Sequence, residues 1–174
     1  MLKNLLILLI LMNLLSCKTN RDLSTVGEVN LEKYAGQWYE IARLPNKFEK
    51  GLKCITATYS LKKNGKIEVL NKGFSIEKMG ESDAAKGTAW IPDPNYPGRL
   101  KVSFFWPFAG DYYIISLDEE YQYVLVGDPS RKYLWILSRT KKLDDTIYSK
   151  LIDIGRQNGF KVEDIIKVDH DCEQ

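Results

Sequence analysis

The segment Gly36-Gln37-Trp38-Tyr39-Glu40-Ile41-Ala42-Arg43 decides the fold, because it places aromatic and β-branched residues directly after a glycine. This composition is typical of a β-strand. Further short apolar segments follow, separated by turn residues such as Asn64-Gly65, a strong signal for a tight hairpin. We predict strands over residues 37–44, 54–62, 66–73, 85–91, 99–105, 111–117, 121–127 and 132–139.

Eight consecutive short strands with tight connections predict an all-β fold, an antiparallel up-and-down meander that closes into a barrel. A two-sheet sandwich is the alternative that the pattern alone leaves open. One helix is predicted after the strands, because Leu143, Ile147, Leu151 and Ile154 recur on one helical face. We expect this helix to pack outside the barrel and residues 162–168 to add a short strand.

Three segments resemble the motifs of the lipocalin family. Residues 36–43 resemble the first motif, Gly127-Asp128-Pro129 occupies the place of the second, and Leu134-Trp135-Ile136-Leu137-Ser138-Arg139-Thr140 resembles the third. The resemblance covers about residues 30–170 and is greatest to the bacterial outer-membrane lipocalins, a branch similar to apolipoprotein D. It implies that Arg139 stacks on Trp38 beside Gly36, at the closed base of the barrel, as a cation–π pair.

The N-terminal residues have the pattern of an export signal. Lys3 precedes an apolar run over 5–15 that is too short to cross a bilayer as a helix. Leu14-Leu15-Ser16-Cys17 resembles the bacterial lipobox, which implies acylation of Cys17, and the following Lys18 implies sorting to the outer membrane. A plain cleaved signal with an incidental Cys17 is the alternative. We therefore expect a signal peptide at 1–16, a lipidated tether at 17–30 and a lipocalin domain at 31–174.

Charge and cysteine usage narrow the class of protein further. The formal net charge of +2 argues against a nucleic-acid-binding surface. Apart from Cys17, the chain has an even pair of cysteines, Cys54 and Cys172, which suggests a disulfide in an exported protein. Residues 48–61, which contain Cys54, also match the outer-membrane branch. Two free thiols are the alternative.

Side chains alternate across a strand, so an inward Trp38 fixes which residues face the barrel interior. The resulting lining is aliphatic and aromatic with few polar groups, which suits a fatty acid, a lysophospholipid or a similar lipid. Side chains that simply fill the barrel are the alternative. The predicted ligand-binding residues are Glu40, Ala57, Tyr59, Val69, Asn71, Ala89, Val102, Phe104, Tyr112, Ile114, Val124, Tyr133 and Trp135. The same alternation turns Ala42, Ile55, Ile67, Gly87, Ile91, Leu100, Ser116, Val126 and Leu137 inward and Cys54, Thr56 and Thr58 outward.

The loop between the fifth and sixth predicted strands carries Phe105, Trp106 and Phe108. If Trp38 and Arg139 mark the closed end, this loop belongs to the rim of the open end. Bulky apolar residues there could touch the membrane, guide an acyl chain or contact a partner. The alternative is that they fold back over the core.

We do not expect an enzyme, a cofactor or a metal. The only histidine, His170, lies near the C-terminus without a nucleophile beside it, so we expect a solvated tail residue. No zinc-type cluster or inward histidine for haem is found in the sequence. Glu40 is the one acid–base candidate inside the barrel, so a barrel isomerase or hydrolase stays open, as does a structural envelope lipoprotein without a ligand. The expected partners are a lipid ligand and the membrane, with a homodimer as an open oligomeric state.

Overall fold

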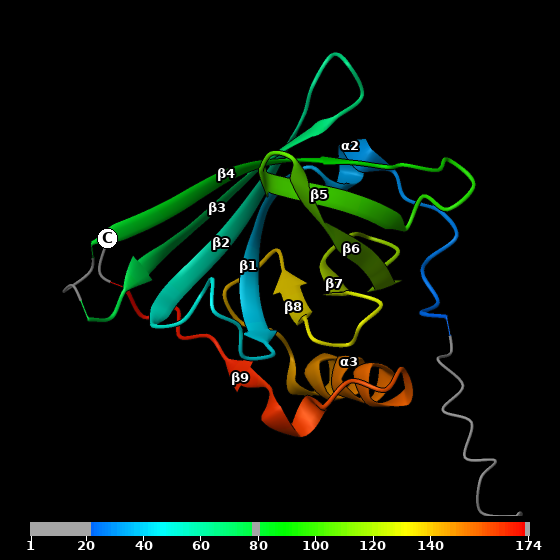
Figure 1. Ribbon diagram of the computed structural model, residues 1–174. Helices are drawn as coiled ribbons and strands as arrows, with labels where there is room; N and C mark the ends of the chain where they lie inside the picture. Colours follow the sequence, from blue (N-terminus) through cyan, green and yellow to red (C-terminus); the bar gives the residue numbers. More distant parts are fainter. Residues whose placement is uncertain (1–21, 78–80, 173–174) are drawn as a thin grey trace, which may run out of the picture.

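The computed structural model describes residues 22–77 and 81–172, so the signal segment and Cys17 lie outside the described residues. One antiparallel sheet has the strand order β2-β3-β4-β5-β6-β7-β8-β1-β9, and β1 also pairs with β2. These pairings close β1 to β8 into a barrel (Figure 1), which confirms the predicted architecture and excludes the sandwich. The barrel strands are β1 (Gly36–Arg43), β2 (Leu52–Leu61), β3 (Ile67–Ser75), β4 (Ser82–Trp90), β5 (Arg99–Phe105), β6 (Phe108–Leu117), β7 (Tyr123–Gly127) and β8 (Leu134–Ser138).

The closed end of the barrel is built around Trp38, whose side chain is fully buried. The guanidinium carbon of Arg139 lies 3.8 Å from the centre of the Trp38 ring. The Arg139 guanidinium also donates hydrogen bonds to five carbonyl oxygens, those of Lys33, Tyr34, Ala35, Gln37 and Tyr121. Gly36 adopts φ +95°, and a Cβ there would lie 3.3 Å from Arg139 Nη1. The base therefore depends on a glycine conformation as well as on the stacked pair.

A single-turn helix that the sequence analysis missed, α2 (Leu31–Tyr34), covers this end. The Asn30 side chain caps it by accepting hydrogen bonds from the backbone N–H groups of Glu32 and Lys33. Trp38 Nε1 donates to the carbonyl oxygen of Tyr34 over 2.8 Å, which fixes α2 to β1. An N-cap asparagine is a readable signal, but the turn is too short to show apolar periodicity.

The outside of the barrel is covered by α3 (Asp145–Gln157), as predicted (Figure 1). Asp144 caps the helix, and the fully buried Leu151 packs in an outer core with Leu134 and Ile136 of β8. A short strand, β9 (Ile166–Lys167), then pairs with β1. The predicted disulfide is confirmed between Cys54 and Cys172, with an S–S distance of 1.97 Å.

The chain packs on the barrel well before residue 31. Leu23 is fully buried in the outer core, and the backbone N–H of Val26 donates to the carbonyl oxygen of Ile114 over 2.9 Å. Asp22 forms a salt bridge of 2.6 Å with Arg99 at the start of β5. From Asp22 onward, the expected tether is therefore attached to the barrel wall.

Two bulges correct the predicted alternation of side chains. The pairing of β1 with β8 shifts between Glu40 and Ala42, so Ile41 and Ala42 both face the outer core. The inward prediction for Ala42 is wrong for this reason. In β6 a shift lies between Ile114 and Ser116, and Ser116 then lies opposite the outward Leu125. The inward prediction for Ser116 is wrong too, because Leu117 packs on the interior instead.

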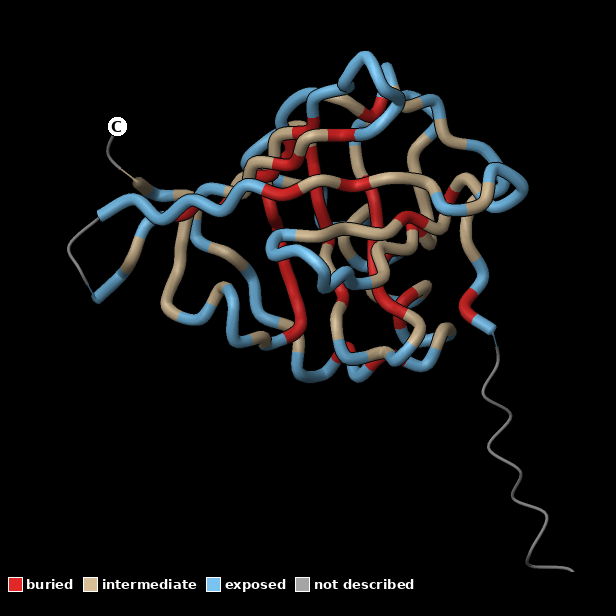
Figure 2. The backbone as a smooth tube through the Cα atoms, turned by 45° about the horizontal axis from the view of Figure 1, so that its top comes forward, coloured by how far each residue is buried: buried red, intermediate tan, exposed pale blue. Residues whose placement is uncertain are grey.

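The barrel is longer on one side than on the other. In Figure 1, β2, β3 and β4 extend beyond the remaining strands, towards the end of the described chain. Figure 2 shows that buried residues lie mainly in the barrel wall, whereas residues 74–77 and 81–84 of the extension are largely exposed. This side of the open end therefore projects into solvent.

Candidate lipid-binding cavity

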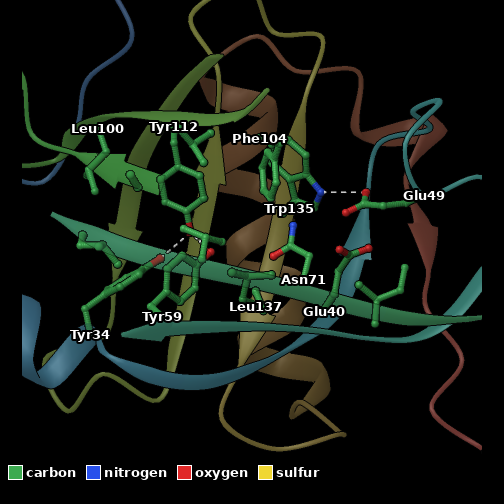
Figure 3. Close-up of a pocket in the computed structure, with 16 residues that line it drawn as sticks. Tyr34, Glu40, Glu49, Tyr59, Asn71, Leu100, Phe104, Tyr112, Trp135 and Leu137 are labelled. Atoms are coloured by element: carbon green, nitrogen blue, oxygen red, sulfur yellow. Dashed lines mark hydrogen bonds between the residues drawn. The ribbon is translucent and has the colours of Figure 1, made fainter. Parts of the chain in front are cut away.

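A cavity of about 90 Å³ lies inside the barrel between the base and the open end (Figure 3). Ten of the predicted ligand-binding residues line it: Glu40, Ala57, Tyr59, Val69, Asn71, Ala89, Val102, Phe104, Tyr112 and Trp135. The other lining residues are Tyr34, Glu49, Ile55, Ile67, Leu100 and Leu137. The wall is thus mostly apolar, with tyrosines at one end, Glu40 and Glu49 at the other, and Asn71 between them.

The three remaining predicted residues do not line the cavity. Ile114 and Val124 are fully buried in the packed core that contains Trp38 and are not among the cavity-lining residues. Tyr133 precedes β8 and lies further out, where its ring stacks on that of Trp135 at a centroid distance of 5.8 Å. An inward side chain does not necessarily line the cavity, because its position along the strand also matters.

Three tyrosine hydroxyls form the deep polar end of the cavity. The Tyr112 hydroxyl lies 2.7 Å from that of Tyr34 and 2.8 Å from that of Tyr59. Burial raises the pKa of all three phenols, so each keeps its proton at neutral pH. Three O–H groups share two hydrogen bonds, so one donor of the group is left for a ligand acceptor.

Asn71 supplies a second polar group, about midway along the cavity in Figure 3. Its Oδ1 atom is buried and has no hydrogen-bond partner. A buried acceptor without a partner is costly, by about 1–3 kcal/mol. The interior thus presents an unpaired acceptor in addition to the spare tyrosine donor.

The outer end of the cavity holds a charged cluster of Glu40, Arg43 and Glu49. Arg43 Nη1 donates to Glu40 Oε1 over 2.9 Å, and Arg43 Nη2 donates to the Glu49 carbonyl oxygen over 2.7 Å. Trp135 Nε1 donates to Glu49 Oε2 over 3.1 Å, which fixes the indole over the cavity (Figure 3). Burial, reinforced by the nearby Glu49, raises the pKa of Glu40 well above its ordinary value, against the opposing effect of Arg43.

Arg43 and Glu49 were missed by sequence reasoning. Regular alternation from Trp38 turns Arg43 outward, and only the bulge after Glu40 brings it inside. Glu49 belongs to the loop between β1 and β2, whose path the alternation of side chains does not predict. No signal in a single sequence marks either position.

The predicted rim aromatics lie in solvent. Phe105, Trp106 and Phe108 are 75%, 80% and 72% exposed. Phe48, in the loop between β1 and β2, is 76% exposed as well. These side chains form an apolar surface at the open end and do not fold back over the core.

His170 differs from the expectation of a solvated tail residue. Its Nε2 atom lies 2.8 Å from the Glu40 carbonyl oxygen, and its ring packs edge-on against Tyr39.

Within residues 22–77 and 81–172, no group of three or more His, Cys, Asp or Glu side chains is placed to hold a metal. Over the same residues, no helix is long and apolar enough to cross a membrane.

Comparison with known proteins identifies the family. The model of the lipocalin-like domain matches residues 29–170. The chain belongs to the lipocalin family. Among its lipocalin relatives, the outer membrane lipoprotein Blc of Vibrio cholerae is 44% identical over 144 residues, 82% of this chain and 84% of that protein. Mouse apolipoprotein D is 38% identical over 149 residues, 80% of this chain and 76% of that protein.

Two further proteins are similar to this chain. The Escherichia coli K12 outer membrane lipoprotein Blc is 41% identical over 148 residues, covering 85% of this chain and 83% of that protein. The structure of insecticyanin from the tobacco hornworm Manduca sexta superimposes with a TM-score of 0.67 at 23% identity, over 85% of this chain and 84% of that one. The latter likeness supports the lipocalin barrel alone.

Proposed function

We propose that this lipocalin is a membrane-anchored carrier that binds a small lipophilic ligand with one polar group, such as a fatty acid or a lysophospholipid. The observation that supports it is the cavity, whose apolar wall ends in a spare tyrosine O–H donor and passes the unpaired Asn71 Oδ1. Binding sites for apolar ligands combine such a wall with a few placed polar groups.

The cavity volume limits how such a ligand binds. Pockets that enclose a drug-sized ligand measure roughly 300–1,000 Å³, whereas the enclosed space here is about 90 Å³. A long acyl chain therefore either displaces lining side chains or extends beyond the enclosed space. Phe104, which is 44% exposed while lining the cavity, is the side chain best placed to move.

The anchor is part of the proposal. Acylation of Cys17 would hold the barrel at a membrane surface, since each buried methylene contributes about 0.8 kcal/mol. Relatives at 41–44% identity are named outer membrane lipoproteins, which supports the same location for this chain. The exposed rim aromatics would then meet lipid or a ligand leaving it.

Glu40 supports a structural role better than a catalytic one. Its carboxyl group is paired with Arg43 and lies beside Glu49, at the outer end of the cavity. An acid–base group needs a substrate atom within hydrogen-bond reach, and Arg43 already occupies one of its oxygens. Binding without turnover is therefore the function that we propose.

Native mass spectrometry of the full-length chain, purified from its host and then delipidated and reloaded with palmitate, tests the proposal. One palmitate per chain is the expected result. Ala57→Phe, inside the cavity, should lower the affinity at least about tenfold, or ~1.4 kcal/mol, whereas Ala84→Phe on the exposed face of β4 should not.

Should Ala57→Phe fail to fold by circular dichroism, Ala89→Leu replaces it, because Ala89 lines the same cavity from β4. Equal palmitate affinities for the wild-type chain and both folded cavity variants would contradict binding in the barrel.

A further inference from the structure

The pairing between β4 and β5 is the shortest part of the barrel wall to carry the cavity lining. These strands pair only at Thr88–Ser103, Ala89–Val102 and Trp90–Lys101. On the open side of Thr88, β4 continues back to Ser82 and β5 continues to Phe105, without further pairing between the two strands. We call the unpaired stretch that begins between Gly87 and Phe104 the β4–β5 seam.

Phe104 closes this seam by resting on Gly87. A Cβ atom at Gly87 would lie 2.8 Å from Phe104 Cδ1 and 2.9 Å from the Ser103 carbonyl oxygen, closer than real Cβ atoms approach. The close approach of the ring thus requires glycine at position 87. Phe104 lines the interior cavity on one side and a groove on the outer surface of the barrel on the other.

The outer groove is larger than the cavity and is positively charged. Its volume is about 630 Å³, and it is lined in part by Lys62, Lys66, Lys86, Trp90 and Trp106.

The acidic side chain paired with these lysines is Glu68, whose carboxylate lies 3.1 Å from Lys62 Nζ and 3.0 Å from Lys86 Nζ. These two ammonium groups lower the pKa of Glu68, so it stays ionised. Lys66 Nζ lies 6.0 Å from the centre of the Trp90 ring. Three ammonium groups thus face one carboxylate, which leaves an excess of positive charge beside two indoles.

We propose that this groove binds the anionic head group of a single-chain amphiphile, a phosphate or a carboxylate, whose acyl chain passes Phe104 through the β4–β5 seam into the cavity. The proposal rests on the proposed function, because it names where the two ends of that ligand lie. The enclosed 90 Å³ accepts part of a chain, and the adjoining 630 Å³ accepts the remainder. The lysines favour an anionic ligand. The seam favours an amphiphile over a free ion, because only an amphiphile has an acyl chain to place in the cavity.

The head-group site can be tested by comparing two ligands with the same palmitoyl chain, lysophosphatidylglycerol and the uncharged monopalmitoylglycerol. Native mass spectrometry of the full-length chain in a non-ionic detergent gives both dissociation constants. We expect the wild-type chain to prefer the anionic ligand about tenfold, since surface ion pairs contribute ~0.2–1 kcal/mol each. In a Lys62→Gln/Lys66→Gln/Lys86→Gln variant this ratio should fall towards one, with monopalmitoylglycerol binding unchanged.

A matched variant, Lys141→Gln/Lys150→Gln/Lys161→Gln, removes three exposed lysines elsewhere and should keep the preference. Lys66→Gln alone, which breaks none of the Glu68 ion pairs, should lower it partially if the triple variant does not fold. An equal preference in the wild-type and groove variants would overturn the head-group site. Displacement of lysophosphatidylglycerol by millimolar inorganic phosphate would overturn an amphiphile as its occupant.

The seam is tested by the rate at which the chain enters. Phe104→Ala should accelerate uptake of lysophosphatidylglycerol, followed by stopped-flow tryptophan fluorescence. Ile166→Ala, at an exposed position on β9 outside the barrel, should not. Identical uptake rates for Phe104→Ala and the wild-type chain would overturn entry through the seam. Loss of all lipid binding in the wild-type chain would instead refute the proposed function itself, so the two failures are distinguishable.

Discussion

Glu40 and Arg43 form a buried ion pair on one side of β1, although a spacing of three residues places side chains on opposite sides of a regular strand. Arg43 Nη1 lies 2.9 Å from Glu40 Oε1, and both side chains are at most 6% exposed. The bulge after Glu40 makes this contact possible. Because of this one extra residue, Arg43 points inward and pairs with Glu40 at the outer end of the cavity.

Replacing Arg43 by methionine should lower the free energy of unfolding by about 3–5 kcal/mol, because two buried carboxyl groups lose their cation. Urea unfolding followed by circular dichroism measures this. Arg156→Met is the matched control, because Arg156 and Asp153 have the same i,i+3 spacing but are 60% and 61% exposed. We expect that control to change stability by no more than ~0.5 kcal/mol, and similar losses in both variants would show that burial of the pair is not what matters.

The raised pKa of Glu40 predicts a pH dependence of stability. The folded chain holds a proton on Glu40 at pH values where the unfolded chain, with an ordinary pKa of about 4.3, has released it. This contribution is complete below pH 4.3 and is lost as the pH rises through the raised folded pKa. Glu40→Gln, which mimics the protonated group, should therefore unfold at a higher temperature than the wild-type chain at pH 8, with a smaller difference at pH 4.5.

Melting temperatures measured from pH 4.5 to 8.5 check this. Glu28→Gln, on an exposed residue, should run parallel to the wild-type curve. A Glu40→Gln curve that is also parallel would mean that Glu40 titrates normally in the folded chain.

The base of the barrel should depend on the planar fork of Arg139. Lysine keeps the charge but cannot donate to the carbonyl oxygens of Lys33, Ala35 and Gln37 together. We expect Arg139→Lys to cost about 3 kcal/mol of stability, since each lost hydrogen bond to a charged group costs roughly 1.5–3 kcal/mol and lysine restores some of them.

A double-mutant cycle of Trp38→Phe and Arg139→Met measures the stacking energy between the two side chains. We expect a coupling free energy of ~1–2 kcal/mol. A coupling near zero would assign the whole effect of Arg139 to its hydrogen bonds.

The disulfide should contribute strongly to stability, because it closes a loop over a sequence separation of 118 residues. The chain-entropy model gives about 4–5 kcal/mol for a loop of this length. In urea unfolding, a Cys54→Ala/Cys172→Ala variant should be less stable than the wild-type chain by this amount. Reductant should not change the stability of the variant, whereas it should lower the stability of the wild-type chain to about that of the variant. Unchanged stability would mean that the unfolded chain is already compact around this link.

The barrel was predictable from the sequence because strand alternation and the positions of the turns act over short distances. Ala57, Val69 and Ala89 all line the cavity as their alternation indicates. Alternation fails at Ala42 and Ser116, because the bulges that shift them depend on pairing with strands distant in the sequence. Alternation also predicted Tyr133 as a cavity residue, but Tyr133 stacks on Trp135 and does not line the cavity.

The cavity itself was harder to predict than the fold. Its polar groups come partly from Tyr34 on a single-turn helix and Glu49 in a loop, neither of which belongs to a strand. The outer groove and the β4–β5 seam depend on where two strands stop pairing, which no residue pattern in β4 or β5 marks. Sequence reasoning thus identified the wall of the cavity, but not its two ends or its side opening.

The salt bridge between Asp22 and Arg99 restricts how the barrel can lie on a bilayer. Only four residues lie between Cys17 and Asp22, a reach of at most about 18 Å even when fully extended. β5 runs from Arg99 to Phe105, roughly 20 Å, so the aromatic hairpin lies at the opposite end of this strand from Asp22. A lipid on Cys17 would thus hold the start of β5 within about 18 Å of the bilayer surface, since the chain is attached to the wall there by Asp22.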